Sequence, residues 1–256
     1  MARVRLEKAA GVARVTIDRP EVRNAFDDAV VHELRETFEE LARGEDLRAV
    51  VLAGAGKVFC AGADAESMRR SAGMTEAQNR SSARDMAEMF RAIDTCPVPV
   101  IGRLQGAAMG GGVGLVACCD VVVAADDAKV AFSEARLGVV PAVISAFVLP
   151  KIGASAARRY FLTAETFSSM EARAMGLVHE VVPADALDTK IAEVLAAIAA
   201  CGPRAVREAK RLVRSMGALS GDAALDHAAS VIARLRASAE GQEGLAAFLE
   251  RRKPAF

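Results

Sequence analysis

The chain has 256 residues, of which 52% are hydrophobic, and its 33 Lys and Arg residues balance 33 Asp and Glu residues to give a formal net charge of zero. This composition argues against a disordered protein and gives no support for binding to nucleic acid or to an anionic membrane. No apolar run approaches the length of a membrane span. A chain of this length buries a sizeable core, either in one domain with an appendage or in two small domains.

The chain has five cysteines, an odd number, and the neighbours Cys118 and Cys119 cannot readily pair with each other. We therefore expect reduced thiols, and we expect no metal site because no spacing of ligand residues suggests one. The N-terminus, Met1–Arg5, leads directly into a strand-like pattern and lacks the apolar core of a signal peptide. These features predict a cytoplasmic protein.

In chain order, the first expected elements are a hairpin and an amphipathic helix. Residues Val4–Lys8 and Val12–Ile17 are rich in β-branched side chains and flank a turn, which is typical of paired strands. Apolar residues at helical spacing predict a helix over 27–43, and the apolar run Ala49–Leu52 predicts a short buried strand. Thr75–Gln78 has the pattern of a capping box and predicts the start of a helix.

Strands and helices continue to alternate through the middle of the chain. Two prolines end the preceding helix and lead into a predicted strand at Val100–Leu104. A helix is expected after Gly112, and two further strands are expected at Val121–Ala124 and Val130–Phe132. This alternation predicts a largely parallel sheet or a spiral of strands.

The residues after Pro183 change character, because nearly all of them have helical patterns. The expected helices are Ala186–Ala200, Pro203–Met216, Ala223–Ala237 and Gly241–Arg251. They are amphipathic and rich in Ala, and they lack the bulk for a core of their own. We therefore expect a core of residues 1–182, followed by a helical region of residues 183–256 that packs on the core and on neighbouring subunits.

Two turns rich in Gly and Ala stand out, at Phe59–Asp64 and at Gly106–Gly112. Each turn follows a short apolar run and precedes a stretch that can form a helix. Small residues let a ligand approach the backbone closely, and a helix start leaves N–H groups without intrahelical partners. Two such starts that face one point would hold a developing oxyanion, which predicts chemistry on an acyl thioester.

These turns, together with motifs along the whole chain, resemble the crotonase superfamily, the enoyl-CoA hydratase/isomerase family. The other motifs are Arg19-Pro20, Arg23-Asn24-Ala25-Phe26, Glu134, Leu137-Gly138, Pro141 and Phe248-Leu249-Glu250-Arg251-Arg252-Lys253. The resemblance implies an α/β fold, a crotonase-like spiral of ββα units with a C-terminal helical region for oligomerisation. It also implies a closed homo-oligomer, either a trimer or a dimer of trimers.

The same resemblance implies roles for residues of both turns. The backbone N–H groups of Ala63 and Gly111 would form the oxyanion hole for the thioester carbonyl. Coenzyme A would bind as part of the substrate and not as a permanent cofactor, along the backbone of Ala25, Ala61, Ala63, Asp64 and Ala65. Its phosphates would meet Arg23 and a C-terminal cation, Arg251 or Lys253, which a neighbouring subunit would supply. The alternative for these C-terminal cations is a solvated helix end.

Family hydratases normally act with two carboxylates, and this chain retains one of the two positions. Glu134 stands in the loop before Leu137-Gly138, where an enclosed carboxyl group would have a raised pKa and would exchange a proton with the substrate. The other position falls at Gly114, which is neither an acid nor a base. Either Gly114 makes room for a branched or carboxylated acyl group or it allows close helix packing, and the sequence leaves both open.

The resemblance also implies an acyl pocket. Its residues would be Met68, Gly114, Leu137 and Gly138. Met68 follows the first turn, where the family places a mobile wall of this pocket. Arg69 and Arg70 lie beside it, and they either meet a substrate carboxylate or belong to a solvated helix face.

A narrower resemblance bears on the substrate. Segments 110–120, 133–134, 141–145 and 157–163 look like the bacterial methylglutaconyl-CoA hydratases of leucine and isovalerate metabolism. That branch implies a lyase that interconverts 3-methylglutaconyl-CoA and 3-hydroxy-3-methylglutaryl-CoA. One alternative is a Δ3,Δ2-enoyl-CoA isomerase, which needs only one carboxylate. Another is RNA binding, against which the neutral charge, the single Tyr160 and the absence of Trp argue.

Overall fold

The computed structural model describes residues 3–256, so that Met1 and Ala2 of the expected strand-like N-terminus lie outside the described residues. The main sheet has six strands in the order β1 (Val4–Ala9), β2 (Val12–Ile17), β3 (Ala49–Gly54), β4 (Val100–Leu104), β6 (Val121–Ala125) and β9 (Glu180–Val182). Only β1 and β2 pair antiparallel, as the expected hairpin, and the other neighbours pair parallel. The central strands are buried, rich in Val and Ala, and typical of a sheet that helices cover.

A second sheet of three strands contains β5 (Ala107–Met109), β7 (Lys129–Ala131) and β8 (Phe167–Ser168). The chain passes from β4 in the first sheet to β5 in the second and then into helix α4 (Gly111–Ala117). It passes from β6 in the first sheet to β7 in the second in the same way. Successive segments of the chain therefore add one strand to each sheet in turn. This arrangement confirms the expected spiral of ββα units.

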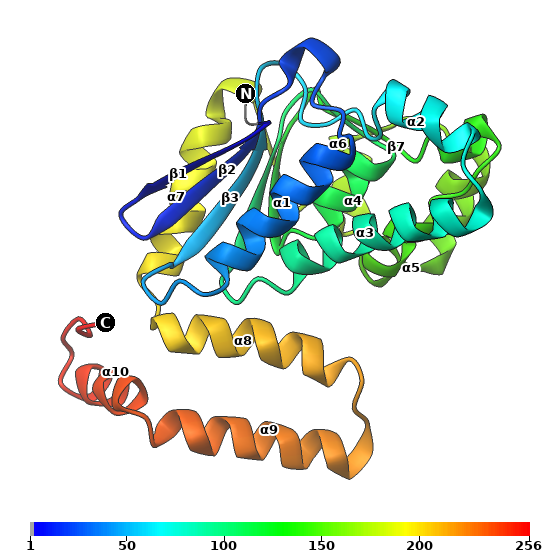
Figure 1. Cartoon of the computed structure of the whole chain (residues 1–256). Coiled ribbons are helices and arrows are strands. Elements are labelled where there is room, and N and C mark those ends of the chain that lie inside the picture. Colours follow the sequence, from blue (N-terminus) through cyan, green and yellow to red (C-terminus); the bar gives the residue numbers. More distant parts are fainter. Residues whose placement is uncertain (1–2) are drawn as a thin grey trace.

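Helices cover the main sheet and follow local signals in the sequence. Figure 1 shows α1 (Asp28–Leu41) and α3 (Glu76–Asp94) on one face and α7 (Leu187–Ala199) on the other. Asp27 caps α1, since its carboxylate accepts a hydrogen bond from the N–H of Val30 at 3.0 Å. Thr75 forms the predicted capping box, and Ser168 forms a second one at the start of α6 (Ser169–Ala174).

The long helix α5 (Ala142–Thr163) had no counterpart among the elements expected from the sequence. It contains Pro150, and its regular conformation is interrupted at Gly153, where φ is +68°. Pro and Gly both disfavour a helix in the local sequence, but tertiary packing stabilises the helix in spite of them. The first turns of α5 pack against α4 through Ile144 and Val148, which are buried in the core.

The last three helices, α8 (Pro203–Met216), α9 (Gly221–Arg236) and α10 (Ala239–Leu249), form a separate layer beside the core (Figure 1). Polar contacts attach α8 to the core, because the ammonium group of Lys210 donates to the Asp120 carboxylate at 2.6 Å and to the Val98 carbonyl at 3.1 Å. By contrast, α7 lies after the boundary expected at residue 183 and buries Leu187 and Ile191 against the sheet. Over residues 3–256, no helix has both the length and the apolar character needed to cross a membrane.

Candidate active site

The two small-residue turns lie side by side because their backbones are hydrogen-bonded to each other. The N–H of Cys60 donates to the Ala107 carbonyl at 3.1 Å, and the N–H of Met109 donates to the Cys60 carbonyl at 3.0 Å. Gly62 has φ of +89°, and a Cβ atom there would lie 2.6 Å from the Met109 carbonyl oxygen. A residue with a side chain would therefore be both strained and crowded at this position.

In this arrangement the two turns each have a backbone N–H group that is not used in hydrogen bonds within the described part of the protein. The N–H of Phe26 donates to the Gly62 carbonyl and the N–H of Asp64 donates to the Phe26 carbonyl, both at 2.9 Å, so that the N–H of Ala63 takes no part in the pairing. Gly111 is the first residue of α4, where N–H groups have no intrahelical partner. Within residues 3–256, neither Ala63 nor Gly111 donates a backbone hydrogen bond to a protein acceptor.

Both donors line a cavity of about 250 Å³, and Glu134 lines it too. Glu134 begins the 3₁₀ turn Glu134–Leu137, and one of its carboxylate oxygens, Oε2, is buried without a hydrogen-bond partner among the described residues. Burial raises the pKa of this carboxyl group above its usual value. Of the described side chains that line the cavity, only that of Glu134 is an acid or a base.

The cavity therefore combines two fixed N–H donors with one desolvated carboxyl group. A thioester carbonyl held by the donors would lie in the cavity that Glu134 also lines. Donors positioned in this way stabilise negative charge as it develops on the oxygen, and a carboxyl group with a raised pKa can accept or donate a proton. The geometry suits formation of an enolate from an acyl thioester.

Two of the four residues expected in the acyl pocket line this cavity and two do not. Met68 and Leu137 are part of its wall. Gly138 ends the 3₁₀ turn with φ of +75°, and a Cβ atom there would face open space. Gly114 is buried in α4, and a Cβ atom on it would collide with Ile144 and lie 2.8 Å from the ring of Phe90. Neither glycine is therefore part of the wall of this cavity in the described chain, since close packing covers Gly114. Their place in the acyl pocket stays a prediction.

The residues expected along coenzyme A gather beside the first turn. The carbonyl of Arg23 accepts a hydrogen bond from the N–H of Ala61 at 3.0 Å, which holds segment 23–26 against the turn. Ala25 is buried, while Arg23 and Ala65 are exposed. These positions stay predictions for the binding of coenzyme A.

Asp64 has a clear local role in this region. Its carboxylate caps α2 (Ala65–Ala72) by accepting from the N–H of Glu66 at 2.8 Å, and it pairs with Arg19 at 3.0 Å. The pKa of Asp64 is lowered, first by the bond from Glu66 and then by Arg19. Lys253 is exposed in the C-terminal segment, which Figure 1 shows on the opposite side of the molecule from α2. Within one chain, Lys253 does not reach this site.

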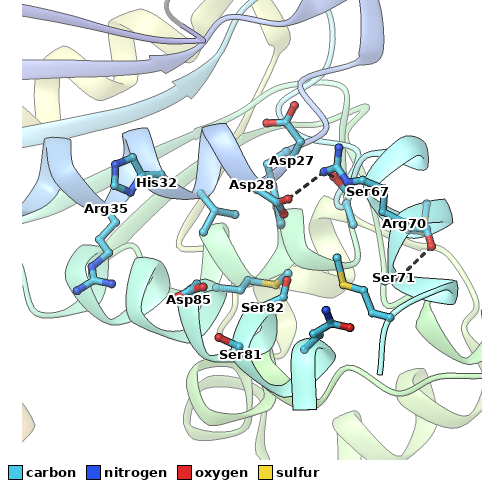
Figure 2. A pocket seen from close by; sticks show the side chains of 17 residues that line it. Asp27, Asp28, His32, Arg35, Ser67, Arg70, Ser71, Ser81, Ser82 and Asp85 are labelled. Carbon is cyan, nitrogen blue, oxygen red and sulfur yellow. Dashed lines mark hydrogen bonds and ion pairs between the residues drawn. The ribbon is translucent and has the colours of Figure 1, made fainter. Parts of the chain in front are cut away.

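A second and larger cavity of about 630 Å³ lies between α1, α2 and α3 (Figure 2). It shares part of its wall with the smaller cavity, namely Phe26, Ala63, Met68 and Met86. The two spaces therefore meet beside the Ala63 donor. We call the four shared residues the neck.

Several residues that shape the site were not among the site residues expected from the sequence. Phe26 lies against Gly111, and Ile144 with the valines before it forms the apolar wall. Phe26 belongs to the motif Arg23-Asn24-Ala25-Phe26, which was a signal for the site. No local signal distinguishes Met86 or Ile144 from ordinary core residues, because their position depends on packing between distant helices.

Comparisons with known proteins found relatives over almost the whole chain. A family model described as Enoyl-CoA hydratase/isomerase matches residues 7–256. A putative enoyl-CoA hydratase of Thermus thermophilus is 30% identical over 253 residues, covering 99% of this chain and 100% of the relative. A probable enoyl-CoA hydratase of Rhodobacter capsulatus is 36% identical over 259 residues, covering 99% of this chain and 97% of the relative.

Solved structures are similar over the whole chain as well. The crystal structure of an enoyl-CoA hydratase from Shewanella pealeana has a TM-score of 0.95 at 37% identity, covering 99% of this chain and 96% of that one. The structure of Pseudomonas aeruginosa AtuE also has a TM-score of 0.95 at 37% identity, covering 98% of each chain.

Proposed function

Since this chain belongs to the enoyl-CoA hydratase/isomerase family and has the crotonase fold, we propose that it is a lyase that adds water to a 2-enoyl-CoA or removes it. Its substrates are acyl-CoA thioesters, as the family implies. The observation that carries the proposal is the meeting of the Ala63 and Gly111 donors with Glu134 in one small cavity.

The reaction can proceed with one carboxyl group. In the hydration direction, the Glu134 carboxylate takes a proton from water as the water oxygen bonds to C3 of the enoyl group. The electron pair of the double bond moves to the thioester oxygen, where the N–H groups of Ala63 and Gly111 stabilise the enolate. Glu134 then returns its proton to C2, so that one water has been added and the enzyme is restored. Dehydration follows the same steps in reverse.

For the acyl group, the narrower sequence resemblance supports 3-methylglutaconyl-CoA as the first substrate to test. The apolar wall that includes Val140 and Ile144 suits its methyl branch. Its carboxylate would need a cation, and no cationic residue lines the smaller cavity in the described part of the chain. The two arginines of the joined cavities, Arg35 and Arg70, both lie in the larger one.

A specific observation supports the Δ3,Δ2-enoyl-CoA isomerase as the second candidate. Glu134 is the one carboxyl group at the described cavity wall, and Ile144 and Phe90 cover Gly114. Migration of the double bond from C3–C4 to C2–C3 needs a single group that removes a proton from C2 and delivers it to C4. Glu134 alone supplies that chemistry, with the same two N–H donors stabilising the dienolate.

The test presents the purified full-length chain with three thioesters, namely crotonyl-CoA, 3-methylglutaconyl-CoA and 3-hexenoyl-CoA. Loss of the conjugated thioester absorbance, with the hydroxyacyl product identified by mass spectrometry, is expected for the first two. Conversion of 3-hexenoyl-CoA to its 2-enoyl isomer without hydration of either conjugated substrate would replace the lyase with the isomerase. Hydration of crotonyl-CoA without turnover of 3-methylglutaconyl-CoA would retain the lyase and remove the finer substrate assignment.

A further inference from the structure

The larger cavity differs in character from the smaller one. Seventeen residues line it, and six of them are apolar while the other eleven carry polar or charged side chains. The four residues of the neck are all apolar, so that the polar side chains belong to the larger cavity alone. A ligand that extends from the thioester site would therefore pass an apolar neck first and meet polar groups farther on.

Of the residues expected to contact coenzyme A, only Ala63, in the neck, lines the larger cavity. Arg23, Ala25, Ala61, Asp64 and Ala65 do not line the larger cavity. The thioester carbonyl at Ala63 divides the substrate into a coenzyme side and an acyl side. With the coenzyme running past the first turn, the larger cavity is left for the acyl chain.

The charges of the cavity disfavour a carboxylate at the end of that chain. Three aspartates and two arginines line it, and both arginines already have carboxylate partners. Arg70 donates to Asp28 at 2.9 Å across the space between α2 and α1, and Arg35 donates to Glu39 at 2.8 Å. An added carboxylate would have to displace one of these pairs and would meet the remaining aspartates as like charges.

Helix α3 contributes polar side chains to the cavity wall that have no hydrogen-bond or ion-pair partner among the described residues. Ser81, Ser82 and Asp85 line it, as Figure 2 shows. Their side chains make no hydrogen bond or ion pair with any residue of the described range 3–256. Serine hydroxyls donate and accept hydrogen bonds, whereas a carboxylate such as Asp85 only accepts them. A neutral hydroxyl group matches this set, because it can donate to Asp85 and exchange hydrogen bonds with both serines.

We propose that the cavity between α1, α2 and α3 binds the far end of the acyl chain, and that this end carries a hydroxyl group. The inference rests on the proposed acyl-CoA chemistry and assigns it a substrate class. This class competes with the carboxylated 3-methylglutaconyl-CoA named under the proposed function. The part of the chain next to the thioester is apolar and fits the neck. Ser81, Ser82 and Asp85 recognise the hydroxyl beyond it.

The test compares three thioesters of equal chain length, namely 8-hydroxy-2-octenoyl-CoA, 2-octenoyl-CoA and 2-octenedioyl-CoA, by their kcat/KM values. The hydroxylated substrate should exceed both others by about tenfold, since a site that hydrogen-bonds a hydroxyl discriminates against chains that lack it. The triple variant Ser81→Ala, Ser82→Ala, Asp85→Leu should bring the hydroxyl and alkyl substrates to similar values. Ala and Leu are strong helix formers, so that α3 is retained.

Arg84→Leu is the matched control, because Arg84 lies on the same helix, is 79% exposed and does not line the cavity. This variant should keep the wild-type preference. Equal or better turnover of the alkyl or dicarboxylic substrate by the wild type would overturn the inference, as would a triple variant that keeps the hydroxyl preference.

Two readouts separate this inference from the proposed function. Hydration of crotonyl-CoA tests the lyase without involving the larger cavity. Calorimetric binding of the unreactive thioesters 8-hydroxyoctanoyl-CoA and octanoyl-CoA tests the cavity without any chemistry. Tighter binding of the hydroxylated thioester by the wild type, reduced in the triple variant, would support the inference even if the enzyme isomerises its substrate. Equal binding of both thioesters by the wild type would contradict it.

Discussion

The side chain of Ile144 occupies the space that any side chain at position 114 would need. A Cβ atom on Gly114 would collide with Ile144 Cγ2 and would lie 2.8 Å from Cζ of Phe90. Ile144 also lines the cavity that contains Glu134. The apolar wall of the cavity that contains Glu134 therefore depends on the absence of a side chain at position 114.

This contact predicts strong coupling between the two positions. Gly114→Ala should destabilise the protein by about 1–3 kcal/mol, because it overpacks the contact between α4 and α5. In the double variant Gly114→Ala, Ile144→Ala, the smaller side chain makes room for the new methyl group. The loss should then be smaller than the sum of the two single losses, as urea unfolding of all four proteins would measure. Additive losses would show that the two side chains do not compete for space.

Glu134→Gln should lower turnover at least about a hundredfold, because the amide keeps the shape of the carboxyl group but cannot exchange its proton. Binding of coenzyme A, measured by calorimetry, should be nearly unchanged. Glu165→Gln serves as a control, since Glu165 pairs with Arg159 on the surface. A folded Glu134→Gln enzyme with wild-type turnover would remove Glu134 from the mechanism.

The raised pKa of Glu134 also predicts an effect on stability with a definite sign. Burial disfavours the charged carboxylate, so that the pKa is higher in the folded protein than in the unfolded chain. Ionised Glu134 therefore costs stability as the pH rises above the unfolded value. Glu134→Gln should raise the free energy of unfolding more near pH 7 than at about pH 4. Urea titrations at several pH values would measure this, and an equal effect at all pH values would contradict it.

Gly111 should tolerate no side chain, because a Cβ atom there would collide with the ring of Phe26. Gly111→Ala keeps the N–H donor but crowds the turn, and we expect it to lower both activity and stability. Phe26→Leu in the same protein should restore part of both, since the smaller side chain relieves the collision.

Gly111→Pro removes the donor itself and should cost about 3–4 kcal/mol of transition-state stabilisation, in addition to any loss of folding. The kcat/KM for crotonyl-CoA, with circular dichroism as the measure of folding, gives this cost. An active and folded Gly111→Pro enzyme would place the second oxyanion donor elsewhere.

The C-terminal helices carry large apolar side chains that one chain leaves in solvent. Val213, Phe248 and Leu249 are 76%, 80% and 79% exposed, and exposed groups of this kind mark protein contacts. We predict a closed homo-oligomer, a trimer or a dimer of trimers, that buries them. Light scattering should give a mass that is a multiple of three chains, and Phe248→Asp should lower it. A stable monomer would also exclude contact of Lys253 with coenzyme A on a neighbouring subunit.

Most regular elements could be predicted from the sequence, because their signals are local. The hairpin of β1 and β2, the amphipathic helix α1 and the capping box of Thr75 all depend on residues close in the chain. The strands β5, β8 and β9 are two or three residues long, which is too short for a periodic pattern. Helix α5 escaped prediction because Pro150 and Gly153 interrupt it.

The sequence by itself determined the family, the two small-residue turns and the single carboxyl group at Glu134, since each is a motif of neighbouring residues. Only the tertiary structure decided that Gly114 packs closely against Ile144, because the two residues are thirty positions apart along the chain. The polar cavity on α3 likewise exists only where three helices meet. Side chains far apart in sequence occupy the same space, and no local pattern records which of them will do so.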